Sequence, residues 1–411
     1  MKSDFSFEIT ARGGAEFPLA RAGVIKTPHG DIQTPTFTVV GTHAEVKFLP
    51  PENLRSIGVQ AVLSNGYHLL RRAVMIDADG GLAKFSGWNG PTLTDSGGFQ
   101  VMSLGSGLGK IVSMDQKDEM IAERLTRKEE RLALVDDEGV EFRDPFSSRI
   151  VKFTPEMSIA TQHKLGADVM MAFDELTSIS DSYEYNIEAL ERTRLWAERS
   201  LREHARQTAM RADKPYQALY GVLQGGHWQD LREKAARDLA AMSIDNWQFD
   251  GFGLGGAFEK ETLGETLAWM TRILPENKPR HLLGLSKPDD IFAGVENGAD
   301  TFDCVAPTRE ARHGRIYTLD GDINLKRSEF KDDQRLLDTE CDCPTCVAGM
   351  NRASLREKLK SLDMNDRSEA MTLLSQHNVR FIIRLMEQTR ESLTSGSFAD
   401  FRDVWLKRYY N

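Results

Sequence analysis

Residues 216–226 read YQALYGVLQGG, an apolar run that ends in a glutamine and two glycines. A continuous apolar run of this length is typical of a strand covered on both faces, as in a parallel sheet. Amphipathic, helix-like sequence follows it. Five further runs share this design: QAVLSN (60–65), ADVMMAFDE (167–175), FDGFGLGG (249–256), HLLGLSKP (281–288) and DTFDC (300–304). Six such units in series predict an α/β protein with a parallel (β/α)8 barrel, the TIM barrel.

The polar residues that end these runs predict where the function lies. In a (β/α)8 barrel, functional side chains lie at the carboxyl ends of the strands. Asp174, Gln224, Gly256, Gly284 and Asp303 each follow or end an apolar run. We therefore expect them to share one rim of the barrel.

The composition limits the class of protein. No apolar stretch approaches the roughly 20 residues needed to cross a bilayer, and the start MKSDFSFEIT lacks the layout of a secretory signal. We expect a cytoplasmic protein that does not contact a membrane. The 411 residues include 52 Lys and Arg against 62 Asp and Glu, a net charge of −10. Any polyanion must therefore be bound by a local basic patch.

Two regions interrupt the barrel pattern. Residues at about 105–135 begin with GSGLG and continue into the charged, helix-like KDEMIAERLTRKEERL, which indicates a surface insertion. We expect residues 1–335 to form the barrel with this insertion. Residues 336–411 hold a cysteine cluster followed by long helical sequence, which predicts a small metal-binding and helical region packed on the barrel.

Three of the four cysteines lie within six positions, as Cys341, Cys343 and Cys346. Clustered cysteines in a chain of this kind indicate a metal site, and His377 in the helical segment MTLLSQHN supplies a fourth ligand. Four N and S ligands close the tetrahedral shell that zinc prefers, so the site is expected to be structural. The alternative is three reduced cysteines and a core histidine.

Three carboxylates form the candidate catalytic set. Asp95 lies in TLTDSGGFQVMSLG (92–105) beside paired glycines, which let a backbone approach a ligand closely. Asp174 and Asp303 follow buried strands. Three carboxylates on one rim permit one to attack an electrophilic carbon, one to move a proton and one to bind N–H groups. Each of them alone is also explained as a helix N-cap.

These residues together resemble a known family. The resemblance is carried in chain order by TDSGGFQVMSL, FDE, LQGG, GLGG, LLGLSKPDD, DTFDCVAPTREAR and the cluster of three cysteines with a histidine. The chain resembles the tRNA-guanine transglycosylases that make queuosine-type tRNA, from about residue 8 to the C-terminus. The resemblance implies a zinc-bearing (β/α)8 barrel that replaces guanine at the wobble position (34) of tRNA with a 7-deazaguanine base.

The resemblance also implies roles for individual residues. Asp303 is the implied nucleophile that attacks the ribose C1′, and Asp95 is the implied general acid and base. Oxocarbenium-like transition states are served by paired carboxylates, as in retaining glycosidases. The implied base pocket, in which Phe99 stacks on the ring and Asp174 accepts from its N–H groups, consists of Ser96, Phe99, Asp174, Gln224, Gly256, Ala257, Leu283 and Gly284.

Three sites depart from the family pattern, and the resemblance implies that all three surround the 7-substituent of the base. They are Leu176, the stretch Ala257-Phe258-Glu259-Lys260-Glu261, and Leu283. We expect 7-aminomethyl-7-deazaguanine (preQ1) to be the incoming base, because Glu259 or Glu261 can pair with its ammonium group. Queuine is the alternative.

The RNA is expected beside the implied nucleophile. The segment from Thr308 to Lys331 has a net charge of +2, and we assign Arg309 and Arg312 to the tRNA anticodon loop. The resemblance implies a homodimer with the zinc region near its interface. No other cofactor is expected.

Other functions fit less well. Relatives that modify the tRNA body carry further C-terminal domains, for which the 34 residues after His377 leave no room. A non-catalytic tRNA-binding partner subunit would be expected to lack the catalytic carboxylates, and Asp95 and Asp303 are both present. A glycosidase function would explain two of the carboxylates but would leave the cysteine cluster unexplained.

Overall fold

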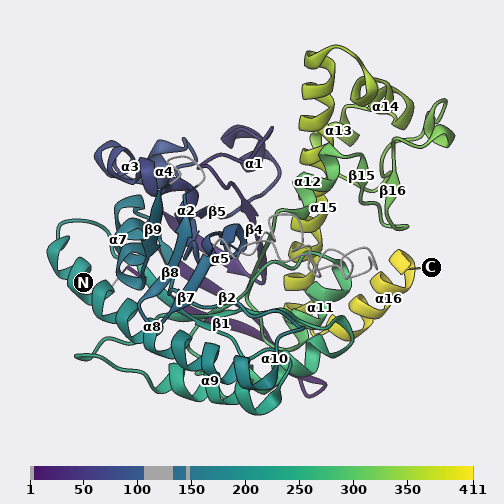
Figure 1. The fold of residues 1–411 in the computed structure, drawn as a ribbon. Helices are drawn as coiled ribbons and strands as arrows, with labels where there is room; N and C mark the ends of the chain where they lie inside the picture. Colours follow the sequence, from purple (N-terminus) through teal and green to yellow (C-terminus); the bar gives the residue numbers. More distant parts are fainter. Residues whose placement is uncertain (1–3, 106–132, 145–148, 411) are drawn as a thin grey trace.

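Eight parallel strands close into a barrel at the centre of the molecule (Figure 1). The computed structural model describes residues 4–105, 133–144 and 149–410. The strands are β4 (Thr36–Val40), β5 (Val62–Asn65), β6 (Thr92–Asp95), β10 (Val169–Met171), β11 (Ala218–Leu223), β12 (Gly251–Leu254), β13 (Arg280–Leu282) and β14 (Thr301–Cys304). The barrel closes where β14 pairs with β4, with Phe302 opposite Phe37. The predicted (β/α)8 barrel is confirmed.

Two barrel strands, β4 and β6, lie outside the six apolar runs because threonines interrupt their pattern. The side chains of these threonines are buried and bonded within the barrel. Thr38 donates to the carbonyl of Phe302 at 2.8 Å, and Thr94 donates to Gln162 Oε1 at 2.9 Å. A satisfied hydroxyl on a β-branched side chain costs little in a buried strand, so these segments form strands despite their polarity.

Helices cover the outside of the barrel and follow the strands in order. They are α1 (Pro51–Ser56), α2 (Gly66–Leu69), α3 (Ala73–Asp79), α4 (Leu82–Phe85), α5 (Gly98–Gly105), α7 (Pro155–Leu165), α8 (Tyr183–Met210), α9 (Gln229–Ala241), α10 (Leu263–Thr271), α11 (Pro288–Glu296) and α12 (Ala306–Arg312), with single turns η1 (Leu70–Arg72) and η2 (Lys260–Thr262). The side chain of Ser182 caps α8, which buries Leu190, Ala197 and Leu201. Ile187 shares their helical spacing but is 45% exposed.

An antiparallel sheet precedes the barrel and consists of β1 (Ser6–Gly13), β2 (Phe17–Thr27) and β3 (Gly30–Thr34). Arg21 of β2 is buried and forms an ion pair of 2.6 Å with Asp300, which directly precedes β14. This pair joins the sheet to the amino-terminal ends of the barrel strands, opposite the rim that carries the predicted site.

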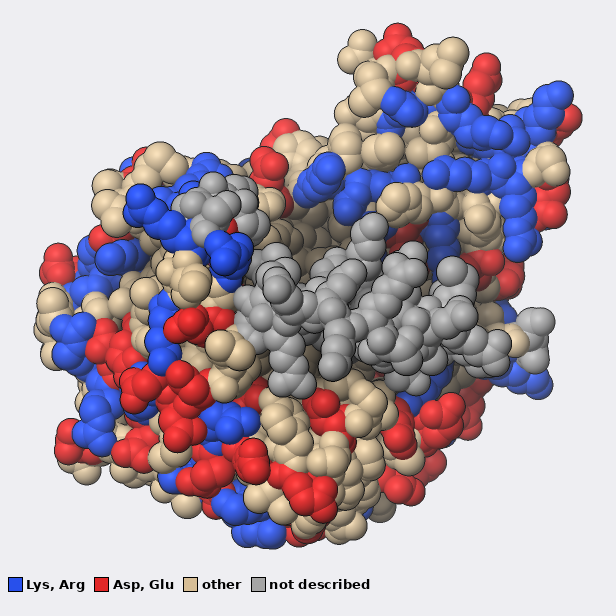
Figure 2. All heavy atoms as spheres, in the orientation of Figure 1, with Lys and Arg blue, Asp and Glu red and all other residues tan. Residues whose placement is uncertain are grey.

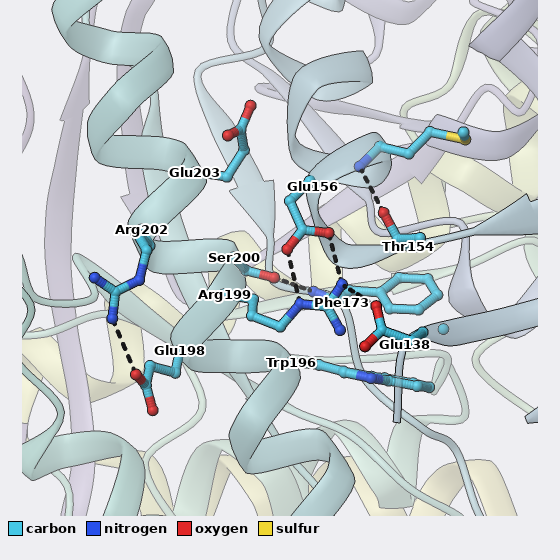
Figure 3. A network of polar contacts seen from close by, with 12 residues as sticks. Glu138, Thr154, Glu156, Phe173, Trp196, Glu198, Arg199, Ser200, Arg202 and Glu203 are labelled. Atoms are coloured by element: carbon cyan, nitrogen blue, oxygen red, sulfur yellow. Dashed lines mark hydrogen bonds and ion pairs between the residues drawn. The ribbon is translucent and has the colours of Figure 1, made fainter. Parts of the chain in front are cut away.

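A second antiparallel sheet lies between β6 and β10. Its strands are β7 (Ala133–Asp136), β8 (Gly139–Arg143) and β9 (Ile150–Phe153). Arg199 of α8 binds both carboxylate oxygens of Glu156 at 2.7 and 2.8 Å and lies 3.8 Å from Glu138 (Figure 3). These contacts join α7, α8 and the turn between β7 and β8. Most of the predicted insertion, residues 106–132, lies outside the described residues.

The C-terminal region has a core of its own that shares one helix with the barrel. It contains β15 (Arg315–Ile316), β16 (Ile323–Asn324), η3 (Ser328–Phe330), α13 (Pro344–Val347) and α14 (Arg352–Lys360), and it stands apart from the barrel in Figure 1. Its apolar core begins at Ala311 and ends at Leu374 of α15 (Met364–Ser395). Further along α15, Ile382 and Leu385 join the barrel core, as does Trp405 of α16 (Phe398–Tyr410). We call residues 313–374 the C-terminal subdomain.

Across residues 4–105, 133–144 and 149–410, every helix is too short or too polar to cross a membrane.

Candidate active site

Asp95 ends β6 and is held by three hydrogen bonds. Its Oδ1 accepts from the N–H groups of Gly66 and Gly97 at 2.9 and 3.1 Å, and its Oδ2 accepts from Asn65 at 2.6 Å. A Cβ on Gly66 would lie 2.7 Å from the carbonyl oxygen of Asp95, so only glycine permits this approach. Burial, aided by the charge of Asp303, raises the pKa of Asp95 to about 7 despite these bonds. This carboxyl group can therefore hold or release a proton near neutral pH.

Asp174 follows β10 and binds two side chains of the site. Its Oδ2 accepts from Gln224 at 2.7 Å and its Oδ1 accepts from Ser96 at 3.2 Å. Burial raises the pKa of Asp174 to about 6. The other amide atom of Gln224, Oε1, is buried without a hydrogen-bond partner among the described residues. Buried polar atoms are normally bonded, so this acceptor indicates a place for a ligand N–H group.

Helix α8 fixes both neighbours of Asp174. The Phe173 N–H donates to Ser200 at 3.2 Å, as Figure 3 shows, and the Glu175 N–H donates to Thr193 at 3.0 Å. Glu175 is buried and forms an ion pair of 2.7 Å with Arg192. Glu175 is therefore engaged by α8, and Asp174 is the carboxylate presented to the mouth of the barrel.

Asp303 lies in β14 and is bound on one oxygen only. Its Oδ1 is 3.1 Å from Nε2 of His281 and accepts from the Gly284 N–H at 3.1 Å. Its Oδ2 has no partner among the described residues. The Nδ1 atom of His281 lies 2.8 Å from Oγ1 of Thr301, which fixes the imidazole ring. The free oxygen of Asp303 is thus available for attack on an electrophile.

The other residues predicted for the base pocket lie around these carboxylates. Phe99 is the second residue of α5, is 37% exposed and belongs to none of the apolar cores of the described chain. Gly97 and Gly98 separate it from Ser96, and a Cβ on Gly98 would lie 3.0 Å from the carbonyl oxygen of Asp174. Ala257 and Leu283 are half-buried, and Gly256 is buried with a positive φ of 110°.

The two arginines predicted to bind RNA lie on α12, directly after Asp303. Arg309 is exposed and Arg312 is half-buried, and neither forms an ion pair with a described residue. Burial and the neighbouring Arg309 lower the pKa of Arg312. Arg315, by contrast, is paired with Asp322 at 2.5 Å. Lys and Arg side chains gather over α12 and the region of β15 and β16 (Figure 2).

The three cysteines of the C-terminal subdomain meet His377, which lies on α15 just beyond the end of the subdomain. One ligand atom from each of Cys341, Cys343, Cys346 and His377 lies within 4.8 Å of all the others. Nδ1 of His377 is 3.5 Å from the sulfur of Cys343 and 3.4 Å from the sulfur of Cys346. In a tetrahedral zinc site, the distance between a nitrogen ligand and a sulfur ligand is about 3.5 Å. Nε2 lies 2.8 Å from the Tyr317 carbonyl oxygen and donates to it, so Nδ1 faces the cluster. These four residues can hold a metal ion.

Comparison with known proteins identifies the family. The family model described as "Queuine tRNA-ribosyltransferase" matches residues 17–411. The chain belongs to this family. A protein of Archaeoglobus fulgidus is 40% identical over 406 residues, which cover 94% of this chain and 96% of that protein. The queuine tRNA-ribosyltransferases of Desulforamulus reducens and Bacillus subtilis are 39% and 37% identical, covering 94% and 95% of this chain and 95% and 93% of their own.

Within this queuine tRNA-ribosyltransferase fold, the sequence did not predict the contacts that hold the carboxylates, although Asn65 ends one of the apolar runs. Asn65 and Gly66 bind Asp95, and His281 contacts Asp303. The signal for His281 was a histidine that directly precedes the apolar residues Leu282 and Leu283. Gly284, predicted to bind the base, donates its N–H to Asp303 in this structure.

Proposed function

We propose that the chain is a tRNA-guanine transglycosylase that replaces guanine at the wobble position (34) of tRNA with a 7-deazaguanine base. The observation that carries this proposal is the pair formed by Asp303 and Asp95. Asp303 has one free carboxylate oxygen, and Asp95 has a pKa of about 7. A nucleophile and a proton carrier at one rim of a barrel, near enough for the charge of Asp303 to raise the pKa of Asp95, suit substitution at a glycosidic carbon.

The exchange proceeds in two balanced displacements at the ribose C1′. In the first, Oδ2 of Asp303 forms a bond to C1′ while the bond from C1′ to guanine N9 breaks. The electron pair leaves with guanine, and Asp95 supplies the proton that neutralises it. In the second, Asp95 takes the proton from the incoming base, whose N9 attacks C1′ and releases the Asp303 carboxylate. The RNA backbone is never cut.

The base is bound by groups that converge on the same rim. Asp174 accepts from the N–H groups of the base, Gln224 and the Gly256 amide bind its other polar atoms, and Phe99 stacks on the ring, with Ser96, Ala257, Leu283 and Gly284 around it. Stacking on an exposed aromatic ring contributes about 1–3 kcal/mol.

We propose preQ1 as the incoming base. Glu259 is half-buried and forms no ion pair with a described residue, so its carboxylate is available to an ammonium group. Exchange assays with purified bases separate this base from queuine: incorporation of preQ1 supports the assignment, and incorporation of queuine alone contradicts it.

We assign the anticodon loop of tRNA to the face that carries Arg309 and Arg312. Both guanidinium groups lack an acid partner among the described residues and follow the proposed nucleophile on one short helix. Arg309→Ala is expected to weaken tRNA binding, with less dependence on salt concentration. Unchanged affinity would contradict this placement.

The metal held by the cysteine cluster is proposed to be one structural zinc ion per chain. It would tie the segment 341–346 to α15 and take no part in the exchange. We also propose a homodimer with this region near the interface, where Val347, Leu362 and Met364 are apolar and 66–99% exposed. Sedimentation velocity of the purified protein tests the dimer.

The function is tested by incubating the protein with tRNA and labelled guanine. Label at position 34 with the wild type, and none with Asp303→Ala, is the expected result. No label with the wild type would reject the proposed function.

A further inference from the structure

Arg232 of α9 is a buried cation without an acid partner. Its side chain is fully buried, and among the described residues no carboxylate forms an ion pair with it. Burial alone lowers its pKa to about 9, so it remains charged at neutral pH. A buried charge is costly, and an apolar side chain of similar size often stabilises a protein as well or better. A role in packing alone therefore does not account for arginine here.

The guanidinium group joins the two loops that carry Gln224 and Gly256. Its Nε donates to the carbonyl of Gly226 at 2.7 Å, in the loop after β11. Its Nη1 donates to the carbonyl of Gly255 at 2.5 Å, in the loop after β12. The ring of Phe258 lies 4.9 Å from the guanidinium carbon and covers it. Arg232 thus holds two neighbouring strand ends in one arrangement.

The bond to Gly255 also sets the direction of the next amide group. The carbonyl of Gly255 and the N–H of Gly256 belong to one planar trans peptide, so they point in opposite directions. Because the carbonyl points to Arg232, the Gly256 N–H points away from α9. This N–H has no hydrogen-bond partner among the described residues, although Gly256 is buried. A Cβ on Gly256 would lie 2.4 Å from Nη2 of Arg232, so only glycine fits this contact.

The neighbouring groups face the same place. A Cβ on Gly255 would lie 2.8 Å from Nε2 of Gln224, so the amide of Gln224 lies beside this peptide. Gln224 in turn donates to Asp174. Gly256 and Gln224 therefore each carry one buried polar group without a hydrogen-bond partner among the described residues, on neighbouring loops: the N–H of Gly256 and the Oε1 of Gln224.

We propose that Arg232 is a positioning residue for base binding: by holding the carbonyls of Gly226 and Gly255, it presents the Gly256 N–H and Gln224 to the free base. This inference rests on the proposed function and deepens it. Arg232 touches neither the base nor the ribose and acts through the two loops. Its loss should weaken binding of the base and leave tRNA binding intact.

Arg280 provides a matched control. It is also buried, and burial lowers its pKa to about 9 as well. It donates to the carbonyls of Gly298 and Leu274 at 3.4 and 3.2 Å. It begins β13, at the end of the barrel opposite the site. Arg280→Lys therefore removes similar hydrogen bonds from a buried arginine, at a place where they do not hold the loops that carry Gln224 and Gly256.

The test compares Arg232→Lys with Arg280→Lys. Lysine keeps the charge but cannot bind two carbonyls as a fork. Arg232→Lys is expected to raise both the KM for guanine in the exchange reaction and the Kd for guanine measured by calorimetry about tenfold. Tenfold is the effect expected from the loss of one hydrogen bond. The KM for tRNA should stay within twofold of the wild-type value. Arg280→Lys should change neither. Arg232→Gln, which buries no charge, is the second variant if the lysine variant does not fold.

Wild-type affinity for guanine in the Arg232 variants would overturn the inference. So would equal losses in Arg232→Lys and Arg280→Lys, or a parallel rise in KM for guanine and for tRNA, because each of these outcomes indicates a structural role alone. Absence of exchange by the wild type would instead reject the proposed function, and the calorimetric comparison would still test Arg232.

Discussion

Nε2 of His281 lies 3.1 Å from Oδ1 of Asp303, and the Gly284 N–H donates to the same oxygen. Two contacts hold the carboxylate by one oxygen and leave the other oxygen without a partner among the described residues. His281→Ala should therefore lower kcat for guanine exchange ten- to a hundredfold by loosening the nucleophile, with KM for tRNA within twofold of wild type. Steady-state exchange kinetics measure both constants, and an unchanged kcat would show that His281 is dispensable.

The protonation state of Asp95 is expected to determine the pH dependence of the first displacement. Burial, aided by the charge of Asp303, raises the pKa of Asp95 to about 7. The group must be protonated to release guanine, so kcat/KM for tRNA should fall as pH rises above about 7. Initial rates of labelled guanine release between pH 5.5 and 9 measure the profile. A flat profile up to pH 9 would remove Asp95 from the role of acid.

Asp174 is predicted to oppose folding at neutral pH. Its pKa is about 6 in the folded protein, above the value in the unfolded chain, because burial disfavours the charged form. The unfolded chain therefore loses its proton first, and stability falls as pH rises from about 4 to about 6. Asp174→Asn should raise the free energy of unfolding by about 1–2 kcal/mol at pH 8 and by much less at pH 4.

Urea unfolding of the wild type and Asp174→Asn at both pH values checks this difference. Asparagine at position 174 can still accept a hydrogen bond from Ser96. It can also bind Gln224 if the side-chain amide of Gln224 rotates by half a turn, so that its oxygen accepts from the new amide group. The packing around the site is therefore preserved. Guanine exchange should be lost in the same variant. A variant that is less stable than wild type at pH 8 would contradict the prediction.

Loss of the metal site is predicted to affect RNA binding more than base binding. His377 donates to the Tyr317 carbonyl, and the next residue, Asn378, donates to the carbonyls of Pro307 and Arg315 at 3.2 and 3.0 Å. The cluster therefore anchors α12 and its two arginines through α15. Cys346→Ser should abolish binding of the proposed zinc ion, lower the free energy of unfolding by several kcal/mol and weaken tRNA binding about tenfold or more.

Elemental analysis, urea unfolding and filter binding measure these three effects. Calorimetry with guanine should give the wild-type Kd, since the base pocket lies on other strands. Cys304→Ser is the control for metal content, because Cys304 lies outside the cluster. Full zinc content in Cys346→Ser would contradict the assignment of the ligands.

The barrel could be predicted from the sequence because strands that are buried on both faces consist of continuous apolar runs. Six strands showed this pattern, whereas β4 and β6 did not, since Thr38 and Thr94 place hydroxyl groups inside the barrel. The antiparallel sheet of β1 to β3 was also not predicted. Its burial pattern is mixed, and it contacts the barrel through the long-range pair of Arg21 and Asp300.

The candidate site was predictable where its residues end strands, and less so where they act through neighbours. Asp95, Asp174 and Asp303 each end or follow a strand, so topology alone brings them to one rim. His281 reaches Asp303 because β13 pairs with β14 in the register that sets His281 opposite Thr301. Arg232 reaches two glycine carbonyls from a helix. Contacts of this kind depend on packing between elements, which no local pattern encodes.

The most direct test of the account is whether Asp303 becomes covalently bound to tRNA. The protein is incubated with a tRNA anticodon stem-loop without free base, denatured, and analysed by gel electrophoresis and mass spectrometry. The account predicts an adduct on Asp303 that disappears when guanine is added before denaturation and that Asp303→Asn does not form. Exchange by the wild type without any adduct, or an adduct that persists in Asp303→Asn, would contradict it.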